Sequence, residues 1–173
     1  MGILLPCAVG LRRKAVQVSC VTRLRQLGLA LQMYRDDWGD FLPHEDGGDT
    51  RPPHGCGWYQ VLPPYAGDPR MSQCPTHPVG ARGFSIKMNG RLLQGGAFFP
   101  YGRLRRPPQT ILLFDGRTDN PGVRSLSKGD WDSASNRHGG RTNLLFCDGH
   151  VEGYAPRMDA AGWDGPGPFL WEP

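Results

Sequence analysis

The sequence has no long hydrophobic run and little excess charge of either sign. It contains 20 Lys and Arg residues against 16 Asp and Glu, a formal net charge of +4 over 173 residues. The apolar stretch at residues 1–11 is shorter than the about 20 residues that a membrane-spanning helix requires. Basic residues gather only in Leu11–Lys14 and Arg103–Arg106, without the interleaved aromatics typical of nucleic-acid-binding surfaces. We therefore expect no membrane span and no nucleic-acid partner, with membrane headgroups as a second candidate partner for the first basic run.

The sequence also lacks the common motifs of enzyme active sites. It has no G-x-S-x-G nucleophile elbow, no G-x-x-x-x-G-K-[ST] phosphate loop and no EF-hand-like run. We therefore expect a protein that is not an enzyme and has no small-molecule substrate.

The chain is rich in turn-forming residues but also in aromatic ones. Its 25 glycines and 17 prolines predict long loops, whereas five Trp, five Tyr and seven Phe argue against a disordered chain. The length predicts one domain over residues 1–173. Within it we expect an N-terminal helix at 1–39, a loop and sheet region at 40–155 and an irregular tail at 156–173.

Residues 14–38 show the clearest helical pattern. Apolar side chains recur every three or four residues, as on one face of a helix. They are Val16, Cys20, Leu24, Leu27, Leu31, Tyr34 and Trp38. Gly28 lies on this helix and weakens it, which indicates a point of close packing, and Gly39 is a natural stop. The stripe predicts a helix docked on a sheet.

Four segments downstream predict strands. Residues 84–89 alternate apolar and polar, and 110–114 form a β-branched and aromatic run. Residues 143–147 and 150–154 flank Asp148-Gly149, which indicates a two-residue hairpin turn. A helix followed by strands predicts an α+β fold with a small antiparallel sheet of about four strands.

Several of these segments together resemble the major pseudopilins of type II secretion, in their planctomycete-like form. The resemblance rests on Ser19–Tyr34 followed by Asp40–Pro43, on Trp58–Tyr65 and Cys74-Pro75, and on the Ser85–Asn89 strand. His138, followed after nine residues by Asp148-Gly149, is similar to the family's C-terminal motif. The similar region covers roughly residues 3–154. The resemblance implies a pilin-like fold and a prepilin-type structural subunit of a secretion or pilus system.

Members of that family begin with a basic leader, a prepilin-peptidase site and an apolar helix half that anchors them in the inner membrane. Here Ile3–Pro6 corresponds to the end of that apolar half, so the chain is expected to be N-terminally truncated and soluble as given. The resemblance implies other pseudopilin subunits as partners, and a location in the inner membrane and periplasm or in a surface filament. The expected assembly helix would use Leu5, Val16, Cys20, Leu24, Leu27 and Leu31.

Two groups of side chains could bind a metal. His138, Asp148, His150 and Asp115 offer imidazole and carboxylate ligands that suit a transition metal, and the carboxylates with loop carbonyls could bind Ca²⁺. A turn role for Asp148 and a backbone hydrogen bond for His138 are the competing interpretation.

The second group combines His54 and Cys56 with Cys74 and His77. Tetrahedral Zn²⁺ accepts such a set, and a Cys56–Cys74 disulfide is an equal competitor in an exported protein. Free thiols and surface histidines are a third interpretation. No cofactor is certain, and Ca²⁺ and Zn²⁺ are the candidates.

The alternative function is a soluble metal- or carbohydrate-binding module on the same scaffold. Tyr101, Trp131 and Trp163 could form an aromatic platform for a sugar, although they could equally anchor loops in a Gly- and Pro-rich fold.

Overall fold

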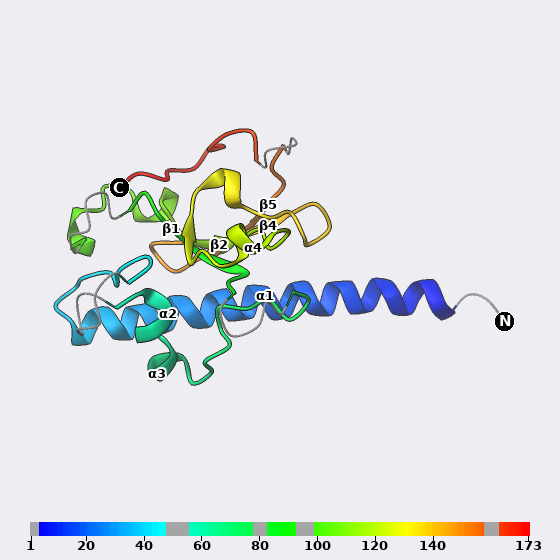
Figure 1. Ribbon diagram of the computed structural model, residues 1–173, viewed down its shortest axis with the longest axis horizontal. Coiled ribbons are helices and arrows are strands. Elements are labelled where there is room, and N and C mark those ends of the chain that lie inside the picture. The colour runs from blue at the N-terminus through cyan, green and yellow to red at the C-terminus, as the bar shows by residue number, and fades with distance from the viewer. Residues whose placement is uncertain (1–3, 48–55, 78–82, 93–98, 158–162) are drawn as a thin grey trace.

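A long helix crosses one face of a small sheet and extends well beyond it (Figure 1). The structure is a computed structural model that describes residues 4–47, 56–77, 83–92, 99–157 and 163–173, with side chains of the first helix described from residue 10 on. Helix α1 spans Leu4–Asp37. It ends where Gly39 takes a φ of 67°, a left-handed conformation that glycine adopts without strain. No helix in these described ranges is both long and apolar enough to cross a membrane.

The predicted apolar stripe of α1 is the face that packs on the sheet. Cys20, Leu24, Leu27, Leu31 and Tyr34 are at most 4 % exposed. Val16 is half-buried and Trp38, just beyond the helix, is exposed. The buried leucines lie inside the chain's own core, so the expectation that they mediate assembly with other subunits is wrong for this fold. The Leu5 side chain lies outside the described residues.

The sheet has five strands, in the order β3-β1-β2-β4-β5. The strands are β1 (Ile86–Asn89), β2 (Ile111–Asp115), β3 (Lys128–Gly129), β4 (Thr142–Phe146) and β5 (Val151–Tyr154). All neighbours are antiparallel except β1 and β3, which pair in parallel. The α+β class is confirmed, but the sheet is mixed and not purely antiparallel, because the short β3 returns to the edge of β1.

Short helices connect these elements. They are α2 (Trp58–Val61), α3 (Pro63–Ala66) and α4 (Pro121–Arg124), with single 3-10 turns at Tyr101–Arg103, Pro107–Gln109 and Trp131–Ser133. Helix α3 packs against α1. Residues 58–66 therefore form an anchor of two short helices against α1.

Both faces of the central strands are covered, which explains why β1, β2 and β4 are buried at every position. On one face, side chains such as Leu112 and Leu145 pack with the leucines of α1. On the other, Phe114 and Phe146 pack with Trp163 and Trp171 of the C-terminal tail. The tail is irregular, as expected, but its Trp163 and Trp171 are buried and complete the core on this face of the sheet.

The β4–β5 turn is longer than predicted. Phe146 N–H donates to the carbonyl of His150, which leaves Cys147–Gly149 as a three-residue loop. Gly149 has a φ of 94°, and its N–H donates to the carbonyl of Phe146. This is the geometry of a hairpin that closes with a glycine in a left-handed position.

Candidate functional site

Four polar side chains from distant parts of the sequence meet under α1. Cys20 lies on the sheet-facing side of α1, Cys74 in the loop before β1, Asp115 at the end of β2 and His138 in the turn before β4. All four are buried: Cys20, Cys74 and Asp115 are 0 % exposed and His138 is 6 % exposed. Buried polar groups need partners, so this cluster is where the fold concentrates its interior chemistry.

Three of the four side chains lie within coordination range of one another, and the fourth, Asp115, adjoins His138. The sulfurs of Cys20 and Cys74 and a ring nitrogen of His138 are all within 4.8 Å of each other. Cys74 Sγ lies 3.7 Å from His138 Nε2, and the same Nε2 lies 3.5 Å from Asp115 Oδ2. Asp115 Oδ2 also accepts the backbone N–H of Asn143 at 2.9 Å, whereas the buried Oδ1 has no hydrogen-bond partner.

The cluster is strongly polarised. The hydrogen bond from Cys20 lowers the pKa of Cys74 to about 3, helped by His138 and Thr76 and opposed by burial. The same contact raises the pKa of Cys20, because this thiol keeps the shared proton, and burial raises it further. Burial acts to lower the pKa of His138, but Asp115 and Cys74 outweigh it and raise that pKa to about 9. Without a bound cation, a Cys74 thiolate therefore faces a His138 imidazolium.

Hydrogen bonds with neighbouring side chains and backbone groups hold the cluster in place. The N–H of Cys74 donates to Ser85 Oγ, and Cys74 Sγ lies 3.0 Å from Thr76 Oγ1. Arg137 is held by the carbonyls of Ser85 and Gly116. His138 sits in a turn whose next residues, Gly139 and Gly140, have φ values of 66° and 81°. Two successive left-handed residues require glycine, which is why His-Gly-Gly turns the chain here.

The structure divides the first predicted metal group between the two ends of β4. His138 and Asp115 meet at one end. Asp148 and His150 lie at the hairpin turn at the other end, where both are exposed and His150 Nδ1 lies 2.6 Å from Asp148 Oδ1. The His150 ring stacks on Phe146 at 4.3 Å. Asp148 and Gly149 are therefore turn residues, and the predicted site that joined Asp148 and His150 to His138 is not formed.

The second predicted group is not formed either. Cys56 and Cys74 are both free cysteines, so the Cys56–Cys74 disulfide is absent. His77 is exposed, and the described metal-capable groups pair Cys74 with Cys20 and His138, not with Cys56 or His77. His54 lies outside the described residues. Proximity in sequence was a poor guide here, because the loop before β1 turns Cys74 inward under α1.

The aromatic residues considered for a sugar platform are separated. Trp163 is 3 % exposed inside the core on the tail side of the sheet. Trp131 lies under the guanidinium of Arg91, 4.1 Å from the ring centroid, and Tyr101 lies under that of Arg35 on the α1 side. They anchor loops on both sides of the sheet and do not form a shared surface.

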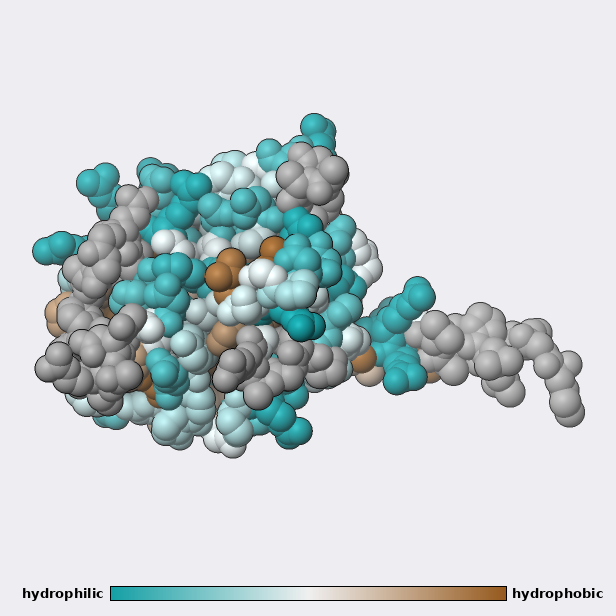
Figure 2. Space-filling view, viewed as in Figure 1, coloured by the Kyte–Doolittle hydropathy of each residue, from teal (hydrophilic) through white to brown (hydrophobic). Residues whose placement is uncertain are grey.

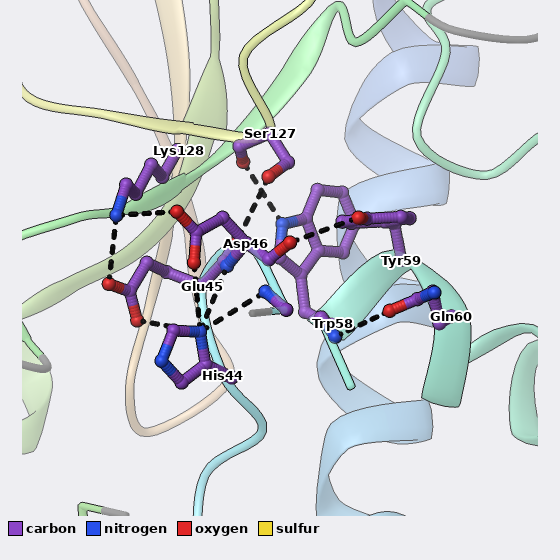
Figure 3. Close-up of polar contacts among 10 residues, drawn as sticks. His44, Glu45, Asp46, Trp58, Tyr59, Gln60, Ser127 and Lys128 are labelled. Carbon is purple, nitrogen blue, oxygen red and sulfur yellow. Dashed lines mark hydrogen bonds and ion pairs between the residues drawn. The ribbon is translucent and has the colours of Figure 1, made fainter. Parts of the chain in front are cut away.

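A second group of metal-capable side chains, His44, Glu45 and Asp46, lies beside β3 (Figure 3). Lys128 Nζ already bridges the two carboxylates, at 3.1 Å from Glu45 Oε1 and 2.6 Å from Asp46 Oδ2. His44 Nδ1 accepts the backbone N–H groups of Asp46 and Gly47. The cationic lysine occupies the position that a metal would take, so this group is a structural ion-pair network.

Replacing Lys128 with methionine should destabilise the fold by about 1–2 kcal/mol, because it leaves the nearly buried Glu45 carboxylate unpaired. Urea denaturation checks this. Adding Glu45→Gln to Lys128→Met should recover part of the loss, since the unpaired charge is then gone. A double variant that is less stable than Lys128→Met alone would contradict this role for the lysine.

A groove of about 620 Å³ runs beside the Cys–His cluster. His138 lines it together with Arg13 and Lys14 of α1, Arg137 and Thr76. A separate cavity of about 290 Å³ lies at the hairpin end, lined by Gly28, Tyr101 and Asp148 among others. Of these two hollows, the larger has a member of the cluster, His138, in its lining.

Cys20 is the member of the cluster that the sequence pattern does not identify as a ligand. It was counted among the apolar positions of the helix, where a buried thiol is unremarkable. Its distinguishing signal is that the stripe places it on the sheet-facing side, where Asp115 also ends an apolar strand.

Comparison of the chain with family models gives no match, and comparisons with curated proteins and with solved structures give no significant match.

Proposed function

We propose that this chain is a non-catalytic structural subunit of the pseudopilin type, which assembles through the exposed face of α1. The observation that carries the proposal is that α1 extends beyond the sheet: Gly10–Ala15 are all exposed, Figure 1 shows the helix running past the sheet toward its N-terminal end, and Figure 2 shows hydrophilic residues standing out from the globular part. A long N-terminal helix whose C-terminal half packs on a sheet is also what a pilin-like fold requires.

The assembly surface we propose differs from the buried stripe. Large apolar side chains remain exposed along α1: Leu11 is 68 %, Val18 64 %, Leu29 62 % and Met33 52 % exposed. At about 100° per residue, these four positions fall within an arc of about 60° on the side opposite Leu24 and Leu27. We call these four residues the outer stripe. Apolar residues aligned on a solvent-facing helix surface favour packing against another helix.

The resemblance to pseudopilins supplies the partners and the location in this proposal. The partners are other subunits of the same kind, and an apolar segment preceding the described helix would place the protein in the inner membrane, facing the periplasm, before filament assembly. The system that it would serve is one of secretion or pilus type.

Cysteine cross-linking tests the assembly surface. In a Cys7→Ser background, Val18→Cys on the outer stripe should give covalent dimers after mild oxidation, in a yield that rises with protein concentration. Ser125→Cys, at an exposed position directly after α4 and away from α1, is the matched control and should stay monomeric. Equal dimer yields from the two variants, or none from either at high concentration, would contradict the proposal.

A metal-binding module is the second candidate function, favoured by the cluster of Cys20, Cys74 and His138. These ligands are buried between helix and sheet, which suits a structural ion better than one that is exchanged or delivered.

A further inference from the structure

One polar atom of the cluster under α1 has no hydrogen-bond partner among the residues that the structure describes. Asp115 is 0 % exposed, its Oδ2 accepts the N–H of Asn143, and its Oδ1 has no hydrogen bond. A buried carboxylate oxygen without a donor is costly unless a cation faces it. The Nε2 atom of His138 lies 3.5 Å from the other oxygen of this carboxylate, and the sulfurs of Cys20 and Cys74 lie within 4.8 Å of a ring nitrogen of the same histidine.

We propose that Cys20, Cys74, His138 and Asp115 bind one zinc ion, which ties α1 to the sheet. Two thiolates, one imidazole and one carboxylate form a ligand set that tetrahedral structural zinc accepts. The site draws two ligands, His138 and Asp115, from the first group considered from sequence and one, Cys74, from the second, and it adds Cys20. It goes beyond the proposed assembly function and stands whether or not the chain assembles.

The distances fit a tetrahedral ion. With Zn–S near 2.3 Å and Zn–N and Zn–O near 2.0–2.1 Å, ligand atoms of such a site lie about 3.6 Å apart for sulfur and nitrogen and about 3.4 Å apart for nitrogen and oxygen. The observed separations are 3.7 Å from Cys74 Sγ to His138 Nε2 and 3.5 Å from His138 Nε2 to Asp115 Oδ2. Both separations thus match the spacing of ligands of one ion, and the Cys20 sulfur lies within 4.8 Å of the Cys74 sulfur and of the His138 ring nitrogen.

The direction of the imidazole distinguishes a metal site from a catalytic triad. In a Cys-His-Asp relay, one ring nitrogen faces the nucleophile and the other faces the carboxylate. Here the same atom, Nε2, faces both Cys74 and Asp115. Cys74 is also 0 % exposed, so a substrate has no access to its sulfur. Convergence on a single nitrogen is what ligands of one ion do.

The charges of the site are also compatible with zinc. Binding requires both thiols to be deprotonated and His138 to be neutral, and the displaced protons pass to solvent. Zn²⁺ with two thiolates and the Asp115 carboxylate carries a net charge of −1. The guanidinium of Arg137 is held by the carbonyls of Ser85 and Gly116. Its positive charge acts to lower the pKa of Cys20 and compensates the charge of the site. Thr76 Oγ1, 3.0 Å from Cys74 Sγ, is positioned to donate to the thiolate.

The ion would add a direct link among four segments that packing and hydrogen bonds already hold together. Its ligands come from α1, the loop before β1, the end of β2 and the turn before β4. The groove lined by His138, Arg137 and Thr76 borders the site on the side of His138. The ion would also fix the orientation of α1 relative to the sheet.

Metal analysis of the full chain tests the site. After reduction, loading with Zn²⁺ and removal of loose metal on a chelating resin, the wild-type chain should retain about one zinc ion per molecule. Cys20→Ser, Cys74→Ser and His138→Ala should each retain less than about a tenth of that. Cys147→Ser removes an equally buried thiol outside the cluster, and Asp148→Ala removes a motif residue at the far end of β4; both should retain zinc fully.

Wild-type protein alone gives a second readout if the ligand variants do not fold. Co²⁺ loading should produce the intense visible absorption and sulfur-to-metal charge transfer of a tetrahedral thiolate site, and Zn²⁺ should displace it. The proposal is overturned if the reduced wild-type chain retains no zinc, if it joins Cys20 to Cys74 in a disulfide and still takes up no metal after reduction, or if Cys147→Ser loses as much zinc as Cys20→Ser. None of these results depends on cross-linking at Val18.

Discussion

A strong chelator should lower the thermal unfolding midpoint of the zinc-loaded chain by about 10 °C. An ion that binds only the folded state stabilises it by about 4 kcal/mol when its free concentration is 1,000 times Kd. For a domain of this size, each 1 kcal/mol shifts the midpoint by about 2–4 °C. Removing the ion also leaves Cys74, His138 and Asp115 buried without its positive charge. Differential scanning calorimetry with and without chelator measures the shift.

The ligand variants provide the control for this experiment. Cys20→Ser should already have the lower midpoint, and the chelator should not lower it further. Cys147→Ser should respond to the chelator as fully as the wild-type chain, because Cys147 lies outside the cluster. A wild-type midpoint that the chelator does not move would contradict the role of the ion as a structural link.

Replacing Asn89 with alanine should destabilise the fold by about 3 kcal/mol. Asn89 is 0 % exposed at the end of β1, and its amide nitrogen donates to the carbonyls of Ile111 and Trp171 at 2.8 and 2.9 Å. Its Oδ1 accepts the N–H of Arg91 at 3.0 Å. The alanine variant loses three hydrogen bonds at roughly 1 kcal/mol each and leaves buried carbonyls without a donor. Urea denaturation followed by circular dichroism measures the loss.

The effect should be specific to the buried position, because Asn89 links the central strands to the C-terminal tail. Asn136→Ala, at an exposed asparagine, should change the stability by less than about 0.5 kcal/mol. A loss in Asn89→Ala no larger than in Asn136→Ala would show that the tail is held by other contacts, such as the packing of Trp171 on Phe114.

The elements that sequence patterns predicted are those with strong local signals. The period of the α1 stripe identified the helix, and the alternation at 84–89, the β-branched run before Asp115 and the Asp-Gly turn signal identified four strands within about two residues of their bounds. Strand β3 gave no such signal, because Lys128–Gly129 is two residues long and lies in a polar loop. It forms because Ser127 and Lys128 are held from outside, by the Trp58 indole N–H to the Ser127 carbonyl and by the contacts of Lys128 with Glu45 and Asp46 (Figure 3).

The prediction of close packing at Gly28 is confirmed. A methyl group added there would lie 3.1 Å from Leu145 Cδ1, so this glycine does mark a close approach of helix and sheet.

The Cys–His cluster lay beyond the reach of local patterns. Cys20 and His138 are separated by more than a hundred residues, and only the docking of α1 on the sheet brings them together. The sequence predicts one metal site that contains Cys74 and Cys56 and another that contains His138 and Asp148, because each pair is close along the chain. Strand β4 separates the second pair, since it runs from the turn that holds His138 to the turn that holds Asp148. The histidine that stands nine residues before Asp-Gly thus belongs to the opposite end of the sheet.

X-ray absorption at the zinc edge of the loaded full chain tests the zinc site most directly. We expect a first shell of about two sulfur ligands near 2.3 Å and about two nitrogen or oxygen ligands near 2.0–2.1 Å. Cys147→Ser should give the same shell. A shell of nitrogen and oxygen alone, or one that is unchanged when Cys20 is replaced with serine, would show that any zinc lies elsewhere and that α1 is held to the sheet without it.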